Sequence, residues 1–141
     1  MLLGPGREHL KDRQNVILEL SEMGYRNIMI MEQVNDSLTD KNLADKFSRI
    51  ISTYLPRLYV AFFYKDARMD GVTFELGWLC HLYQASGLSN FLRLLPEKGY
   101  TWEETTPYVP GLLPNVPSTE FDESKTFSKA SQLIHKFVLN L

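Results

Sequence analysis

The 141-residue sequence predicts a single α/β domain, residues 1–141, built on one doubly wound parallel sheet in a three-layer αβα arrangement. Short apolar runs alternate along the chain with longer stretches of helical periodicity. This alternation is typical of parallel strands joined by right-handed crossovers. The run at residues 58–63 is apolar throughout, as expected for a central strand that is covered on both faces.

The expected elements follow from the spacing of apolar residues and from turn residues. Strands are predicted where a short apolar run is bounded by turn residues, and helices where apolar residues recur every three or four positions. In chain order, the strands are expected at residues 1–3, 27–31, 58–63, 90–95 and 118–121, and the helices at residues 11–23, 43–54, 73–84 and 124–140. Gly24 and Pro56 mark the ends of the first two helices. The polar residues 35–40 are expected to form a loop.

Residues 99–117 interrupt the regular pattern. This stretch contains four prolines together with Tyr100, Trp102 and Tyr108, and it is expected to form a long loop. Long ordered loops in compact domains are often functional. The aromatic residues offer apolar surface for a lid or for contact with a second copy of the chain.

Two loops lie at the same edge of the predicted sheet and define the expected binding site. Ligands of open parallel sheets bind outside the carboxyl ends of the strands. The loop at residues 4–12 follows the first strand, and the loop at residues 64–72 follows the third. Glycines would let the backbone approach an anionic ligand, and arginines would donate to a phosphate near the helix N-terminus. The residues expected to contact the ligand here are Gly4, Gly6, Arg7 and Arg13. A plain tight turn also explains the Gly-Pro-Gly sequence, and this alternative stays open.

Glu75 is the residue most expected to carry chemistry. It lies in the apolar segment 72–79, where burial of an ionised carboxylate is unfavourable without compensation. The expected helix begins at about Thr73, so its N-terminus would favour a charged Glu75 in the first turn. Acidic residues also occur in first turns simply to stabilise the helix, and this alternative is equally open. Gly77 in the helix interior suggests close approach by another backbone or by a ligand.

Composition argues against several other classes of function. The formal net charge of −2 does not provide a broad basic surface for a nucleic-acid polymer. Cys80 is the single cysteine and is expected to be an inert thiol. No metal and no cofactor are expected, since the three histidines show no metal-ligand spacing. No apolar stretch reaches the roughly 18 residues of a membrane span, and no signal-peptide pattern is present, so a cytoplasmic location is expected.

Short motifs follow the first and third predicted strands. The segment Asp70-Gly71-Val72-Thr73-Phe74-Glu75-Leu76-Gly77 follows the third strand, and the segments Gly4-Pro5-Gly6-Arg7-Glu8 and Asp12-Arg13-Gln14-Asn15 follow the first. The segment after the third strand resembles the Gly-x-x-x-Glu-Leu-Gly signature of the nucleoside 2-deoxyribosyltransferase superfamily. The segment at residues 12–15 is similar to the Asp-Arg-Gln-Asn segment of these transferases. The segment at residues 4–8 is similar to the Gly-Arg-Glu loop of the related deoxynucleotide N-glycosidases. The resemblance covers residues 2–83.

The resemblance implies a flavodoxin-like sheet and an enzyme that cleaves the bond between a base and deoxyribose. Glu75 matches the catalytic glutamate, which would attack the anomeric carbon and hold the sugar until water or a second base accepts it. The helix N-terminus would keep this carboxylate ionised. The transferases often carry a second acid six positions earlier. This sequence has Met69 there, with Asp70 one position closer and Gly71 beginning the signature. The resemblance implies a catalytic role for Asp70 and contact of Met69 and Gly71 with the substrate. Asp45 is the nearest counterpart of an acid on the preceding helix, at a longer spacing than the family pattern.

The expected ligand is a small nucleoside or its 5′-monophosphate, and the two arginines near the first loop favour the phosphorylated form. Related enzymes usually complete their pockets across subunit interfaces, so a homodimer or higher homo-oligomer is expected. Two alternatives remain. One is an NAD-cleaving hydrolase like those among Toll/interleukin-receptor (TIR) domains. The other is a nucleotide-binding module that kept the pocket and lost turnover.

Overall fold

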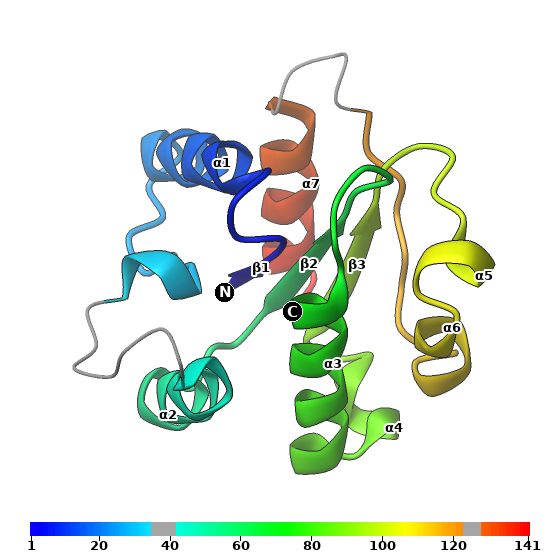
Figure 1. The fold of residues 1–141 in the computed structure, drawn as a ribbon. Helices are drawn as coiled ribbons and strands as arrows, with labels where there is room; N and C mark the ends of the chain where they lie inside the picture. The colour runs from blue at the N-terminus through cyan, green and yellow to red at the C-terminus, as the bar shows by residue number, and fades with distance from the viewer. Residues whose placement is uncertain (35–41, 123–127) are drawn as a thin grey trace.

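Three parallel strands form the sheet, in the order β1–β2–β3 (Figure 1). The computed structural model describes residues 1–34, 42–122 and 128–141. β1 (Leu2–Leu3) pairs with β2 (Tyr59–Phe63), and β2 pairs along its whole length with β3 (Leu92–Pro96). The predicted α/β class with a parallel sheet is therefore confirmed, and the first and third predicted strands lie side by side as β1 and β2.

The outer edge of β1 carries one bridge in place of the strand predicted at residues 27–31. Leu2 bridges Ile30 in parallel, and the amide nitrogen of Leu2 donates to the carbonyl oxygen of Met29 at 2.9 Å. The predicted strand is wrong in extent because β1 is only two residues long and offers no partner for a longer ladder. The chain then turns into the 3₁₀ helix η1 (Met31–Gln33).

The outer edge of β3 is joined by residues 118–121 through two separate bridges, where a continuous strand was predicted. The bridged pairs are Leu94 with Ser118 and Glu97 with Phe121. Pro96, the last residue of β3, lies between Leu94 and Glu97 and has no N–H group, so it cannot donate the hydrogen bond that would join the two bridges. The gap in this edge therefore follows from a single residue.

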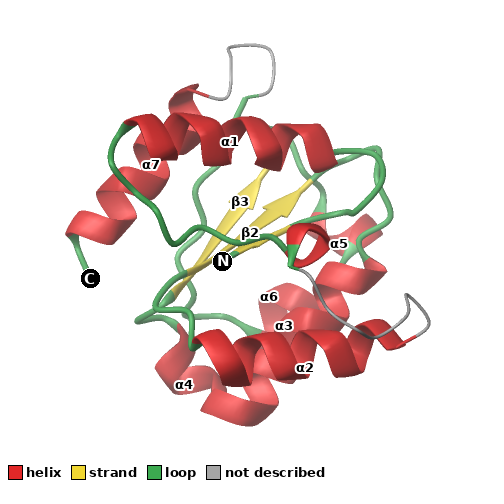
Figure 2. Ribbon diagram, turned by 90° about the vertical axis from the view of Figure 1, so that its left-hand side faces the viewer, coloured by secondary structure: helices red, strands yellow, loops and turns green. Residues whose placement is uncertain are grey.

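Helices cover both faces of the sheet (Figure 2). α1 (Leu10–Glu22) and α7 (Ser128–Leu139) cover one face, and α2 (Leu43–Tyr54) and α3 (Asp70–Tyr83) cover the other. Successive side chains of a strand point to opposite faces, and those of β2 divide accordingly between two apolar cores. Tyr59, Ala61 and Phe63 pack in the core with α2 and α3, and Val60 and Phe62 pack in the core with α1 and α7.

Residues 99–117 are more regular than the predicted long loop. They contain the short helices α5 (Trp102–Thr105) and α6 (Tyr108–Leu112), and another short helix, α4 (Ala85–Leu88), precedes β3. Pro110 lies in the first turn of α6, where a missing N–H group breaks no helical hydrogen bond. The Tyr100 side chain is buried and its hydroxyl bonds the Thr106 hydroxyl at 3.0 Å, so it does not offer the exposed surface expected of it.

Two expectations fall wholly or partly outside the described residues: the loop at residues 35–40 and the first turn of the last helix, residues 124–127. None of the helices in the described parts of the chain is long and apolar enough to cross a bilayer.

Candidate functional site

Arg13 is the buried centre of the site that the sequence placed after β1. Its side chain is 0% exposed although the residue is charged. Its Nη1 donates to the carbonyl oxygen of Pro5 at 2.9 Å, and its Nη2 donates to Oε1 of Glu32 at 2.9 Å. A charge this deeply buried requires such partners. Arg13 therefore links the first loop to the segment that follows Ile30.

The two glycines of the first loop make room for this arrangement. A Cβ atom at Gly4 would collide with the guanidinium of Arg13, and a Cβ atom at Gly6 would lie 3.2 Å from Oε1 of Glu32. Gly4 and Gly6 thus allow the backbone to pass close to a buried ion pair. Arg7, on the same loop, is exposed and can reach a ligand from solvent.

Glu32 was missed by the sequence analysis. It lies in η1, two residues after Ile30, which bridges β1. Its side chain is 31% exposed. The signal was present, because the rule that selected the loops after the first and third strands applies equally to the segment after Ile30. A polar residue at the carboxyl end of the predicted 27–31 strand belonged in the candidate set.

Glu75 is partly buried on α3, and its Oε2 atom is buried without a hydrogen-bond partner among the described residues. Burial raises the pKa of this carboxyl to about 8, the negative charge of Glu32 raises the pKa further, and the positive charge of Arg13 lowers it. Glu75 is therefore mostly protonated at pH 7. It can give up a proton, or act as a carboxylate once ionised.

The structure changes two expectations about Glu75, its position in the helix and its charge. The helix begins at Asp70, so Glu75 is its sixth residue and lies beyond the first turn, where the field of the helix N-terminus has fallen off. Burial raises the pKa of Glu75, and it therefore opposes the ionised form that the helix N-terminus was expected to favour.

The two other predicted acids lie apart from these groups. Asp70 is in the first turn of α3, and its side chain is 66% exposed. Its Oδ2 accepts a hydrogen bond from Nη2 of Arg68 at 2.7 Å, and this contact holds the pKa of Asp70 below its ordinary value. Asp45 is exposed in the first turn of α2. Met69 is buried in the core under α3, and Gly71 is exposed.

A histidine also joins the two predicted loops. The His9 ring stacks on the Tyr64 ring, with centroids 3.6 Å apart and planes 7° from parallel. Its Nδ1 lies 3.1 Å from Oδ2 of Asp12, and its Nε2 lies 2.8 Å from Oδ1 of Asp66. In the sequence, His9 was considered only as a metal ligand, because its contact with Asp66, 57 positions away, leaves no local pattern.

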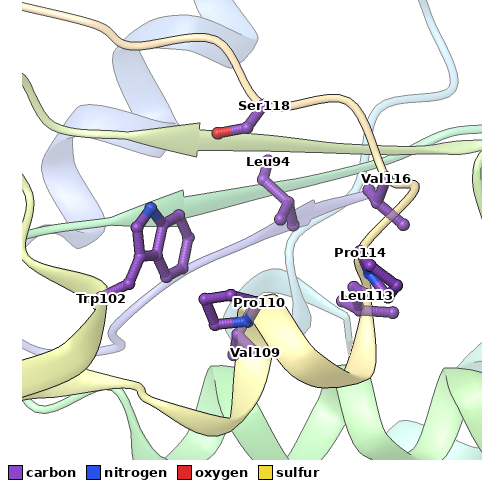
Figure 3. Close-up of a pocket in the computed structure, with 8 residues that line it drawn as sticks. All are labelled: Leu94, Trp102, Val109, Pro110, Leu113, Pro114, Val116 and Ser118. Atoms are coloured by element: carbon purple, nitrogen blue, oxygen red, sulfur yellow. The ribbon is translucent and has the colours of Figure 1, made fainter.

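An apolar pocket of about 180 Å³ lies elsewhere, between β3 and α6 (Figure 3). Most of the residues that line it are apolar, and Ser118 and Trp102 also carry a polar group. The lining consists of Leu94, Trp102, Val109, Pro110, Leu113, Pro114, Val116 and Ser118. The predicted site residues are not part of this lining. The pocket is therefore separate from the group formed by Arg13, Glu32 and Glu75, here called the Glu75 cluster.

Across the described residues, no group of three or more His, Cys, Asp or Glu side chains gathers in a way that could hold a metal ion. No protein-family model, curated protein or solved structure matches this chain. Its function is therefore inferred from the chemistry of these side chains.

Proposed function

We propose that the chain binds a nucleoside or its 5′-monophosphate at the carboxyl ends of β1 and β2 and cleaves its base–deoxyribose bond with Glu75. It would act as an N-glycosidase if water accepts the sugar and as a deoxyribosyl transferase if a second base does. The motifs at residues 4–8, 12–15 and 70–77 support this class.

The observation that carries the proposal is a set of buried polar atoms left without partners. Oε2 of Glu75, Nε1 of Trp78 and Nε of Arg13 are all buried, and none has a hydrogen-bond partner among the described residues. Buried polar groups are nearly always satisfied, and exceptions often belong to binding or catalytic sites. Trp78 follows Glu75 by three positions, which is close to one helical turn on α3. A bound ligand with polar groups would satisfy atoms that the protein leaves unpaired.

The proposed chemistry uses Glu75 as a nucleophile. Its carboxylate oxygen forms a bond to the anomeric carbon while the carbon–nitrogen bond breaks, and the electron pair leaves with the base, which takes a proton from water. Water then attacks the same carbon, gives a proton to solvent and releases free sugar and the Glu75 carboxylate. A second base in place of water gives transfer.

A flavodoxin-like topology is part of this proposal. If the bridged segments at Ile30 and at residues 118–121 count as edge strands, the order across the sheet becomes second, first, third, fourth and fifth. In that topology the strand order reverses between β1 and β2. The Gly4–Gly6 loop and α3 flank this point.

The test is base release from deoxynucleosides, their 5′-monophosphates and NAD, followed by chromatography. Wild type is expected to release base from the first or second substrate class, and Glu75→Gln is expected to lose a thousandfold or more. Glu22→Gln, an exposed change at the far end of α1, is the matched control and should retain the rate. Release from NAD alone would favour the NAD-cleaving alternative, and an active Glu75→Gln protein would remove Glu75 from the mechanism.

The pH profile adds a second readout. Because the pKa of Glu75 is raised to about 8, only a small fraction of the free protein carries the carboxylate at pH 7. We expect kcat/KM to rise about tenfold between pH 7 and pH 9 and then level off, since kcat/KM reports ionisation in the free enzyme. A fall over this range would mean that Glu75 acts as an acid.

A nucleotide-binding module without turnover is the second candidate. The pairing of Asp70 with Arg68 favours it, because it leaves the nearest predicted acid in solvent and not beside Glu75. Calorimetry with a deoxynucleoside monophosphate distinguishes the two. Binding without base release at high protein concentration would select the module.

A further inference from the structure

Glu32 brings a second carboxylate to the Glu75 cluster from a different part of the chain. It comes from η1, Arg13 comes from α1, and Glu75 comes from α3. Glu32 lies near Arg13 because Ile30, two residues before it, bridges β1. The sheet therefore sets the position of Glu32, and the backbone of Gly6 passes beside its Oε1.

Arg13 is the group through which Glu32 can act. The Nη1 and Nη2 groups of Arg13 are 2.9 Å from Pro5 and Glu32, so the guanidinium is held by two contacts. Oε2 of Glu75 has no hydrogen-bond partner among the described residues, although Arg13 is close enough to influence its charge. The Nη2 group of Arg13 is thus already bonded to Glu32.

We propose that Glu32 is the second carboxylate of this site, and that by holding Arg13 through their hydrogen bond it withholds this cation from Glu75. This inference deepens the proposed function and rests on it for the role of Glu75. Glu32 is a positioning residue here, since it acts through Arg13. Asp70 and Asp45 are not needed for this effect.

The charges around Glu75 support this assignment. On the other elements, Glu32 opposes ionisation of Glu75 and Arg13 favours it. On α3 itself, Asp70 is paired with exposed Arg68, and His81 is exposed in the last turn. Removal of the Glu32 charge favours ionisation of Glu75 in two ways. It removes the repulsion between the two carboxylates, and it leaves the positive charge of Arg13 uncompensated. Both changes lower the pKa of Glu75.

The experiment is an NMR titration of glutamate side-chain carboxyls in the full chain, with the Glu75 signal assigned by its loss in Glu75→Gln. In Glu32→Gln, whose amide oxygen can still accept from Arg13, we expect the Glu75 midpoint to move down by about one pH unit. Glu32→Ala is expected to move it at least as far. Glu22→Gln is the matched control, and its midpoint should equal that of wild type.

An unchanged or higher Glu75 midpoint in folded Glu32→Gln and Glu32→Ala proteins would overturn the inference. Backbone amide spectra establish that the variants are folded. No substrate enters this titration, so absence of base release would count against the proposed function and leave the result on Glu32 intact. If base release is observed, the Glu32→Gln pH profile should shift by the same amount as the Glu75 midpoint. A purely structural role for Glu32 would leave that profile in place.

Discussion

At the scale of single residues, Glu75 shows how burial and reactivity compete in this site. Its Oε2 atom is buried without a hydrogen-bond partner among the described residues, and the charges of Glu32 and Arg13 act on its pKa in opposite directions. Burial of a carboxyl costs less free energy when the group is protonated than when it is ionised. The same environment leaves Glu75 poised to ionise close to neutral pH, where small changes in the surrounding charge have a large effect.

Protonation of Glu75 should make stability depend on pH. The ordinary pKa is 4.5 and the folded pKa is about 8, so between these values the folded chain keeps a proton that the unfolded chain has lost. Stability therefore falls as pH rises through this window, and the loss is complete above the folded pKa. Glu75→Gln resembles the protonated acid at every pH. Relative to wild type, its free energy of unfolding should gain on the order of 2–4 kcal/mol between pH 5 and pH 8.5.

Urea denaturation of both proteins at the two pH values measures this gain, since groups that titrate in both proteins cancel in the difference. Glu22→Gln should show a constant difference from wild type. Equal differences for Glu75→Gln at pH 5 and pH 8.5 would mean that folded Glu75 is ionised throughout.

Two glycines should respond in opposite ways to the same substitution. Gly4→Ala places a methyl group against Arg13, whose buried guanidinium has two partners to keep, so it should destabilise by about 1–3 kcal/mol. Gly77→Ala places its methyl group in open space within α3, where alanine favours the helix, and it should stabilise by about 0.5–1 kcal/mol. Thermal or urea unfolding measures both. A neutral Gly4→Ala change would mean that Arg13 can move aside.

At the scale of elements, local spacing predicted the strands and helices whose apolar pattern lies entirely within their own sequence. β2, β3 and α2 lie close to their expected ranges because each carries an apolar run or stripe, which only Arg93 interrupts in β3. The edge segments could not be predicted in the same way, since their extent depends on their neighbours. The two residues of β1 limit pairing at Ile30, and Pro96 interrupts pairing with residues 118–121.

The site was predictable to a similar degree. Glu75 and Arg13 stood out as a carboxylate in an apolar segment and an arginine beside a glycine loop. Their partners did not, because Glu32 is 19 residues from Arg13 and meets it only when the sheet has formed. The protonation of Glu75 was wrongly predicted for the same reason: local position suggested a helix dipole, whereas burial by distant residues decides the charge.

At the scale of the whole molecule, we expect two copies to associate through α5 and α6. Tyr108 is 80% exposed, and Leu112 also exposes apolar surface on the same short helix. Tyr108→Glu should shift a twofold dimer toward monomer by placing a charge in the contact. Leu18→Glu is the matched control, because Leu18 is 63% exposed on α1 and should leave the mass unchanged. Light scattering over a range of concentrations measures the mass. A monomeric wild type at high concentration would contradict this prediction.

The parallel pairing of β1 with β2 also determines when the site can exist. The amino group of Met1 donates to the carbonyl oxygen of Leu58, 57 residues away, and His9 meets Asp66 at the same separation. Bringing such distant segments together has to overcome the entropy of a long open loop before any contact compensates for it. During synthesis, the first loop and Arg13 emerge early but have no sheet to dock against until β2 has followed. The candidate site is therefore completed late in folding, only when the first half of the chain has closed on itself.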